Sequence, residues 1–102
     1  MEAVEEGAVG TKEKGQKGIS PYKVKEKPEN PPTMADGTPI EGLEWRGSKS
    51  AETGYGAWYN PKTGESFHPD LKHPDHGPHW DYRNKQTNEE SRHYPDGTME
   101  LK

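Results

Sequence analysis

Large apolar side chains are scarce in this chain, and their scarcity constrains its fold more than any other feature. Hydrophobic residues make up 25% of the 102 residues, and the mean hydropathy is −1.42. Eight of the nine aromatic side chains lie between Trp45 and Tyr94. Such a chain can build one small core at most, and we expect aromatic side chains to anchor it.

Charge and composition exclude several classes of protein. The net charge is −4, which argues against a broad nucleic-acid surface but leaves room for a nuclease with a few local cations. Because there is no cysteine, the chain has no disulfide, thiolate metal site or thiol nucleophile. No apolar run is long enough to span a membrane or to form a signal peptide, so no membrane partner is expected.

The N-terminal third differs in composition from the rest. Residues 1–37 are rich in Gly, Lys, Glu and Pro and poor in apolar residues. Pro28, Pro31 and Pro32 give this segment polyproline character. We therefore predict a disordered or extended linker over residues 1–37 and one folded domain over residues 38–102. Such a linker is typical of a domain that is cut from a longer protein.

The folded part is predicted to be mainly β. Alternating apolar and polar residues, bounded by turn residues, predict strands near residues 43–46, 55–59, 65–68, 79–83, 91–94 and 98–101. The run 60–64 (Asn-Pro-Lys-Thr-Gly) and the run 95–97 (Pro-Asp-Gly) are turn signals between them. The pattern indicates a small twisted antiparallel β-meander with long loops.

Four of the five histidines lie in one irregular stretch, residues 60–82, which prolines and glycines interrupt. Within it, His68, Asp70 and His73 place two imidazoles and a carboxylate within six residues. One interpretation is acid–base catalysis, because imidazole exchanges protons near neutral pH. A second is a divalent metal site that uses the same residues, and a third is solvated loop histidines with Asp70 capping a turn. The spacing alone does not separate the three.

The run 79–82 (His-Trp-Asp-Tyr) predicts a two-faced strand. On a strand, His79 and Asp81 share one face while Trp80 and Tyr82 share the other. A carboxylate beside an imidazole orients the ring and stabilises its protonated form. We therefore expect a His/Asp couple that faces a cleft. The alternative is a surface ion pair on an edge strand.

Further residues are weaker candidates. Glu65 lies beside the hairpin turn and is a candidate to reach the segment of His68. Glu90 and His93 lie on or near a predicted strand next to that of Asp81 and are candidates to join it as further acids and bases. Candidate substrate-binding residues are Lys62, Arg83 and Arg92 for phosphate, and Trp58 and Tyr82 for stacking on a base. The competing interpretation is a solvated charge for the polar residues and a place in the core for the aromatics.

A long ordered set of motifs adds a family resemblance. The motifs are Trp58-Tyr59-Asn60-Pro61-Lys62-Thr63-Gly64-Glu65-Ser66, His68-Pro69-Asp70-Leu71, His73-Pro74 and Gly77-Pro78-His79-Trp80-Asp81-Tyr82. Together they resemble the C-terminal toxin domains of bacterial polymorphic toxins, in particular polymorphic toxin type 37, over residues 42–102. A weaker likeness to ribosome-cleaving colicins rests on Trp80-Asp81 and Glu90. Here, however, no histidine closely follows Asp81, and the colicin domains are strongly basic.

The resemblance implies a nuclease toxin that acts in the cytoplasm of a competing bacterium. Such domains end larger secreted effectors of the contact-dependent inhibition, Rhs and LXG kinds. A cognate immunity protein would neutralise the toxin in the producing cell. The expected substrate is RNA, either tRNA or rRNA, rather than DNA.

Three hypotheses follow, in order of preference. The first is a metal-independent ribonuclease without a cofactor. Its base would be Asp81 or Glu90, its acid His79 or His68, and its phosphate-stabilising cation Lys62 or Arg83. The second is a metal-dependent nuclease, able to cut DNA, that holds a divalent ion with His68, Asp70 and His73. The third is a binding module without chemistry.

Overall fold

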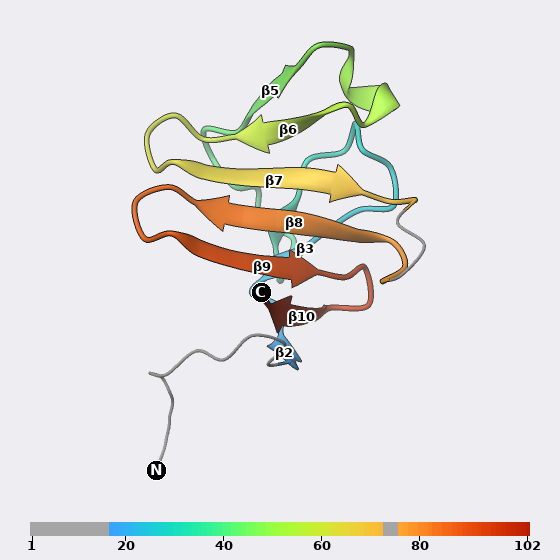
Figure 1. The fold of residues 1–102 in the computed structure, drawn as a ribbon, viewed down its shortest axis with the longest axis vertical. Helices are drawn as coiled ribbons and strands as arrows, with labels where there is room; N and C mark the ends of the chain where they lie inside the picture. The colour runs from blue at the N-terminus through green and yellow to red at the C-terminus, as the bar shows by residue number, and fades with distance from the viewer. Residues whose placement is uncertain (1–16, 73–75) are drawn as a thin grey trace.

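The computed structural model describes residues 17–72 and 76–102 and shows a mainly β protein (Figure 1). Seven strands form one antiparallel sheet in the order β2-β10-β9-β8-β7-β6-β5, and β3 and β4 form a separate pair. The strands are β2 (Lys17–Ile19), β3 (Tyr22–Lys23), β4 (Thr33–Met34), β5 (Glu44–Gly47), β6 (Gly56–Tyr59), β7 (Glu65–Asp70), β8 (His79–Asn84), β9 (Glu89–His93) and β10 (Thr98–Leu101). From β5 to β10 each strand pairs with the next, so the predicted antiparallel meander is confirmed.

Helix is almost absent from the part of the chain that the structure describes. A short 3-10 helix, η2 (Ala51–Thr53), lies between β5 and β6. Among the same residues there is no helix with the length and hydrophobicity that a membrane crossing requires.

The predicted turns set the register of the meander. Gly64 has a φ of 78°, and its amide donates to the Asn60 carbonyl at 2.8 Å. At the other hairpin, Gly97 has a φ of 92°, a conformation that favours glycine. The Tyr94 amide donates a hydrogen bond to the Thr98 carbonyl oxygen at 2.9 Å, which closes this turn.

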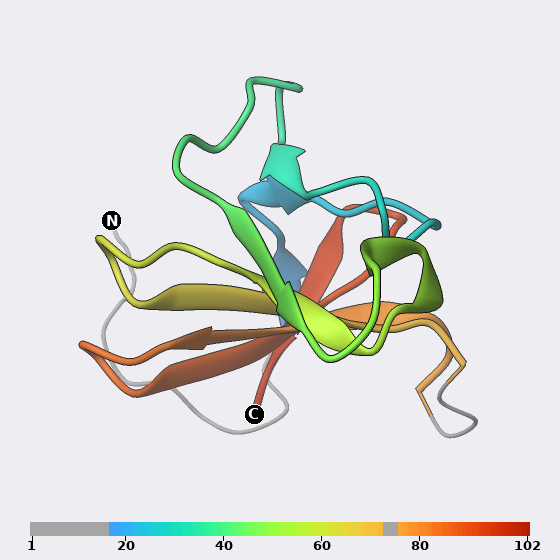
Figure 2. The ribbon, with the colours of Figure 1, turned by 90° about the horizontal axis from the view of Figure 1, so that it is seen from above.

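The core lies on one face of the sheet. Its most buried side chains are Phe67, Trp80 and Tyr82, together with Val24 from the N-terminal segment. Tyr22 packs edge-on against Phe67, with ring centroids 4.9 Å apart. Figure 2 shows the strands fanning out in a twisted sheet, with β3 and β4 stacked over one side. We call this side the covered face and the opposite side the open face.

The segment that the sequence predicts to be a linker is packed against this core from residue 17 onward. The indole Nε1–H of Trp80 donates to the Lys25 carbonyl at 2.8 Å, and that of Trp58 donates to the Pro28 carbonyl at 2.9 Å. Val24 is 4% exposed. The expectation of a flexible segment is therefore wrong for residues 17–37, because they cover the sheet and bond to its indoles. Residues 1–16 lie outside the described part of the chain.

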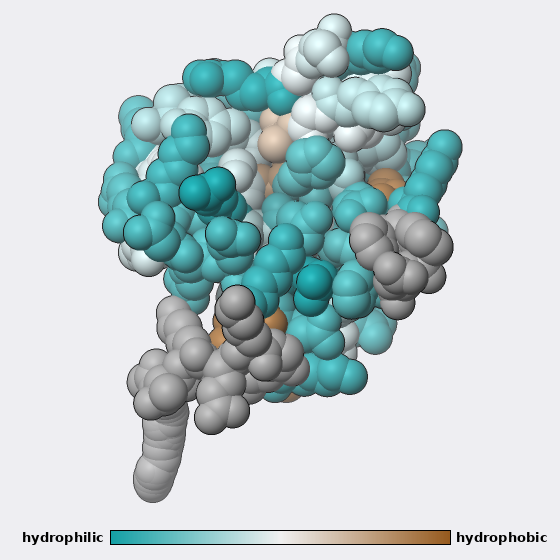
Figure 3. Space-filling model, viewed as in Figure 1, coloured by the Kyte–Doolittle hydropathy of each residue, from teal (hydrophilic) through white to brown (hydrophobic). Residues whose placement is uncertain are grey.

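The open face is polar. Figure 3, in the view of Figure 1, shows mainly hydrophilic residues over the sheet. One row of side chains crosses four strands, because the register pairs His68 with Asp81, Asp81 with Arg92, and Arg92 with Glu100. Asp70 and His79 form the neighbouring pair of this face.

Candidate functional site

The predicted two-faced strand is confirmed. Trp80 and Tyr82 are buried on the covered face, whereas Asp81 lies in the row of the open face. Because side chains alternate along a strand, His79 shares the face of Asp81. The strand pairs on both sides, so it is a central strand of the sheet and the edge-strand alternative is wrong.

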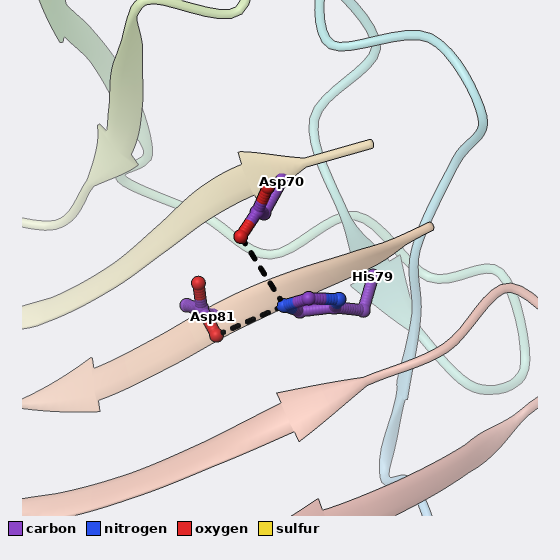
Figure 4. A group of neighbouring side chains, drawn as sticks. All are labelled: Asp70, His79 and Asp81. Carbon is purple, nitrogen blue, oxygen red and sulfur yellow. Dashed lines mark ion pairs between the residues drawn. The ribbon is translucent and has the colours of Figure 1, made fainter. Parts of the chain in front are cut away.

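His79 joins two carboxylates at the centre of this face (Figure 4). Its Nε2 atom lies 3.3 Å from Oδ1 of Asp81 and 3.5 Å from Oδ2 of Asp70. The histidine side chain is 1% exposed, while those of Asp70 and Asp81 are 32% and 27% exposed. The carboxylates therefore reach solvent, and the imidazole lies beneath them.

The other nitrogen of His79 is also engaged. Its Nδ1 atom lies 2.8 Å from the Gly77 carbonyl oxygen, and a carbonyl only accepts, so Nδ1 carries a proton and donates it. Nε2 faces the two carboxylates. The ring is buried and both of its nitrogens are directed at protein groups, so it is the two carboxylates that reach solvent here.

Cations and a hydroxyl complete the surroundings of Asp81. Lys102 Nζ lies 2.9 Å from Asp81 Oδ1 and forms an ion pair with it. This oxygen is buried and accepts no hydrogen bond from the described residues, so the lysine charge is what compensates its burial. Beside it, Arg92 and the Tyr94 hydroxyl both contact Glu100 Oε1, at 3.1 and 3.2 Å. Burial and the Glu100 carboxylate raise the pKa of Tyr94.

The sequence reasoning missed Lys102 and Glu100. A signal for Glu100 was available, because the Pro-Asp-Gly turn at residues 95–97 fixes the register that places Glu100 opposite Arg92. For Lys102 no comparable signal existed, since it follows the last strand.

A cavity of about 530 Å³ opens at the C-terminal end of β7. His68, Asp70 and Lys72 contribute to its lining, and His68 is exposed. Residues two apart on a strand point to the same face and lie roughly 6–7 Å apart. An imidazole and a carboxylate from neighbouring open-face positions of β7 therefore line the same cavity.

Glu65 is not part of this site. It lies on the covered face, where Oε2 accepts hydrogen bonds from the Tyr82 hydroxyl at 2.7 Å and the Tyr22 hydroxyl at 3.3 Å. Burial, and then the contact with Glu65, raises the pKa of Tyr82, and burial is also the main cause of the raised pKa of Tyr22. The expectation that Glu65 reaches the His68 segment is wrong, because Glu65 alternates with the open-face residues of β7.

His93 also lies on the covered face, and it is 1% exposed. Its Nδ1 atom is 2.6 Å from the Ser20 hydroxyl oxygen and its Nε2 atom is 2.8 Å from that of Ser91. Burial lowers its pKa to about 4. This histidine is neutral at pH 7 and belongs to the packing under β3, so it does not join Asp81 as the sequence suggested.

The remaining candidates are spread over the molecule. Trp58 packs its ring against Trp45 at 5.5 Å, and Tyr82 is buried, so both serve the core. Lys62 lies in the turn before β7, so the length of that strand, about 16 Å, separates the turn from Asp70. Arg83 and Glu90 face each other on the open face towards that same distant end.

The structure groups a different set of possible metal ligands from the predicted one. His73 lies outside the described residues, so the structure does not place the predicted set of His68, Asp70 and His73. Among the residues that the structure describes, Asp70, His79 and Asp81 have donor atoms within 4.8 Å of one another. The Gly77 carbonyl orients His79 as backbone carbonyls orient metal-binding histidines.

Comparison of the chain with protein-family models, with characterised proteins and with solved structures finds no match. The residues of the site therefore carry the functional argument.

Proposed function

We propose that this domain is a ribonuclease that cleaves RNA by acid–base transesterification, with its reactive groups on β7. The observation that carries the proposal is that His68 and Asp70 line one cavity at the C-terminal end of β7. Lys72 lines the same cavity and supplies a cation. His79, 3.5 Å from Asp70, supports the carboxylate from below.

The reaction uses one base and one acid. The Asp70 carboxylate takes the proton of the ribose 2′-hydroxyl, and the 2′-oxygen forms a bond to phosphorus. The bond from phosphorus to the 5′-oxygen breaks, and the His68 imidazolium gives its proton to that leaving oxygen. Lys72 stabilises the charge on the phosphorane oxygens. The products are a 2′,3′-cyclic phosphate and a 5′-hydroxyl, and exchange with water restores the two protonation states.

The expected pairing of Asp81 as base with His79 as acid fits the geometry less well. Their contacting atoms are 3.3 Å apart, whereas a base and an acid on opposite sides of a phosphate need a separation of about 6 Å or more. In addition, the ring of His79 is buried with both nitrogens engaged. Asp81, Lys102 and Arg92 are therefore proposed to supply charge beside the reacting groups.

A second candidate is a metal-dependent nuclease. The observation that favours it is the Asp70, His79 and Asp81 group, which offers two carboxylate oxygens and one imidazole nitrogen. Oxygen and imidazole donors suit divalent ions such as Mn²⁺. When bound, such an ion would activate water as a nucleophile. Lys102 is already paired with Asp81 at 2.9 Å and would have to move, which is why this candidate ranks second.

The biological setting is proposed from the resemblance in residues 42–102. On that basis the domain is an antibacterial toxin, delivered in a larger secreted effector and neutralised by a cognate immunity protein. Under the third hypothesis, a binding module, His68→Gln and Asp70→Asn would leave any toxicity intact. Under the proposed function, both substitutions would abolish it.

The test is cleavage of a fluorescent single-stranded RNA in the presence of EDTA. We expect His68→Gln and Asp70→Asn to lower kcat at least 100-fold each. Asp36→Asn is a matched control, because Asp36 is exposed and does not line the cavity. Full activity of both variants, or activity that appears only with added Mg²⁺ or Mn²⁺, would reject the metal-independent mechanism.

A further inference from the structure

The cavity beside His68 and Asp70 has a second wall that the proposed reaction does not use. Glu26 and Pro28 form one side of this wall, and η2 and the residues after it form the other, including Glu52 and Tyr55. The wall is held in place, because the Pro28 carbonyl accepts the Trp58 indole hydrogen bond at 2.9 Å.

Two carboxylates give this wall its chemistry. Glu26 and Glu52 are exposed, and neither has an ion pair or a side-chain hydrogen bond with another described residue. Negative charges of this kind repel a second phosphate, so the wall does not continue the path of the RNA backbone. Carboxylates accept hydrogen bonds, and so they suit the N–H groups of a nucleobase.

An aromatic ring lies at the same wall. Tyr55 is 64% exposed, which is unusual for the large hydrophobic side chains of this domain. Lys49 Nζ lies over its ring, 5.0 Å from the centroid. Aromatic side chains stack on nucleobases in proteins that bind single strands.

We propose that this wall is a nucleobase subsite with a preference for guanine, next to the scissile phosphate. Guanine presents two adjacent donors, N1–H and the N2 amino group, which match the two oxygens of one carboxylate. Adenine and cytosine present an amino group beside an acceptor nitrogen, and uracil presents one N–H between two carbonyls that repel a carboxylate. This subsite rests on the proposed function for its biological meaning, whereas its ligand binding is independent of catalysis.

The experiment titrates the protein with guanosine 3′-monophosphate and, separately, with uridine 3′-monophosphate, followed by amide NMR shifts. We expect the guanosine nucleotide to bind at least tenfold more tightly and to shift the amides of Thr53, Tyr55 and Leu71. A Glu26→Gln/Glu52→Gln double variant should weaken binding of the guanosine nucleotide at least fivefold. Glu41→Gln is the matched control, because Glu41 is exposed outside the cavity.

Each result decides between the two proposals. Equal affinity for both nucleotides, or shifts confined to other surfaces, overturns the subsite even if RNA is cleaved. Tight guanosine nucleotide binding that depends on the two glutamates supports the subsite even if no RNA is cleaved. In that case only the proposal of ribonuclease activity is rejected. A double variant that binds like the wild type also overturns the subsite.

Discussion

Oδ2 of Asp70 lies 3.5 Å from Nε2 of His79, on the neighbouring strand of the open face. The two residues are direct partners in the register of β7 and β8. Asp70 also lines the cavity, whereas His79 does not line it and has a buried ring. This relationship makes His79 a positioning residue for the carboxylate that we propose as the base.

His79→Gln tests this positioning role. Glutamine can keep an amide donor near Asp70 but has a different shape and reach, so the carboxylate loses its fixed orientation. We expect kcat for RNA cleavage to fall about 100-fold while KM changes less than threefold. Stopped-time assays over a range of RNA concentrations separate the two constants. A rise in KM with an unchanged kcat would instead assign His79 to substrate binding.

The buried histidine of the covered face predicts a pH-dependent stability. The pKa of His93 is lowered from 6.5 to about 4, so between these values the unfolded chain binds a proton that the folded chain does not. Stability is therefore complete above pH 6.5 and falls as the pH drops towards 4, by on the order of 3 kcal/mol in total.

Urea titrations at pH 7.5, 5.5 and 4.5 measure this loss. His93→Gln removes the titrating ring, so its stability should vary less with pH than that of the wild type. An equal loss in both proteins would show that other groups cause the acid sensitivity.

A variant of Glu65 tests whether the covered face affects stability without affecting the site. Glu65→Leu leaves the hydroxyls of Tyr22 and Tyr82 without their part-buried acceptor. We expect the free energy of unfolding to fall by about 2–4 kcal/mol. Cleavage by the protein that remains folded at low temperature should stay within threefold of the wild type. A 100-fold loss of kcat in folded Glu65→Leu would place Glu65 in the reaction after all.

The contact of β5 with β6 depends on two facing glycines. A Cβ on Gly56 would clash with the Arg46 carbonyl oxygen and would lie 2.7 Å from the Gly47 Cα. Since backbone cannot move aside cheaply, Gly56→Ala should lower the melting temperature by several degrees. Gly18→Ala is the matched control, because its Cβ would meet only Met99 Cγ at 4.0 Å. Equal melting temperatures for the two variants would contradict the close approach.

Local patterns predicted the meander because strand alternation and turn chemistry depend on neighbouring residues. The alternation of residues 79–82 correctly assigned Asp81 to one face and Trp80 to the other. The same alternation from Phe67 would have placed Glu65 on the covered face. Packing of residues 17–37 was not predictable in this way, because it depends on distant contacts such as the Trp80 indole bond to Lys25.

The cavity itself was beyond local reasoning. Its walls come from three segments far apart in the chain, represented by Glu26, Tyr55 and Asp70. Only the order of the strands and the covering of the sheet bring these segments together. The sequence predicted His68 and Asp70 as candidate site residues, and that remains a prediction. The different place of His79 could not be predicted, because the burial of its ring depends on the fold.

The most direct test of the central claim is the mass of the fragments from a defined RNA oligonucleotide incubated with the domain and EDTA. We expect fragments that end in a 2′,3′-cyclic phosphate paired with fragments that begin with a 5′-hydroxyl, and none of either from the Asp70→Asn protein. Intact RNA in EDTA, or fragments with a 3′-hydroxyl and a 5′-phosphate after a divalent metal is added, would contradict transesterification by His68 and Asp70.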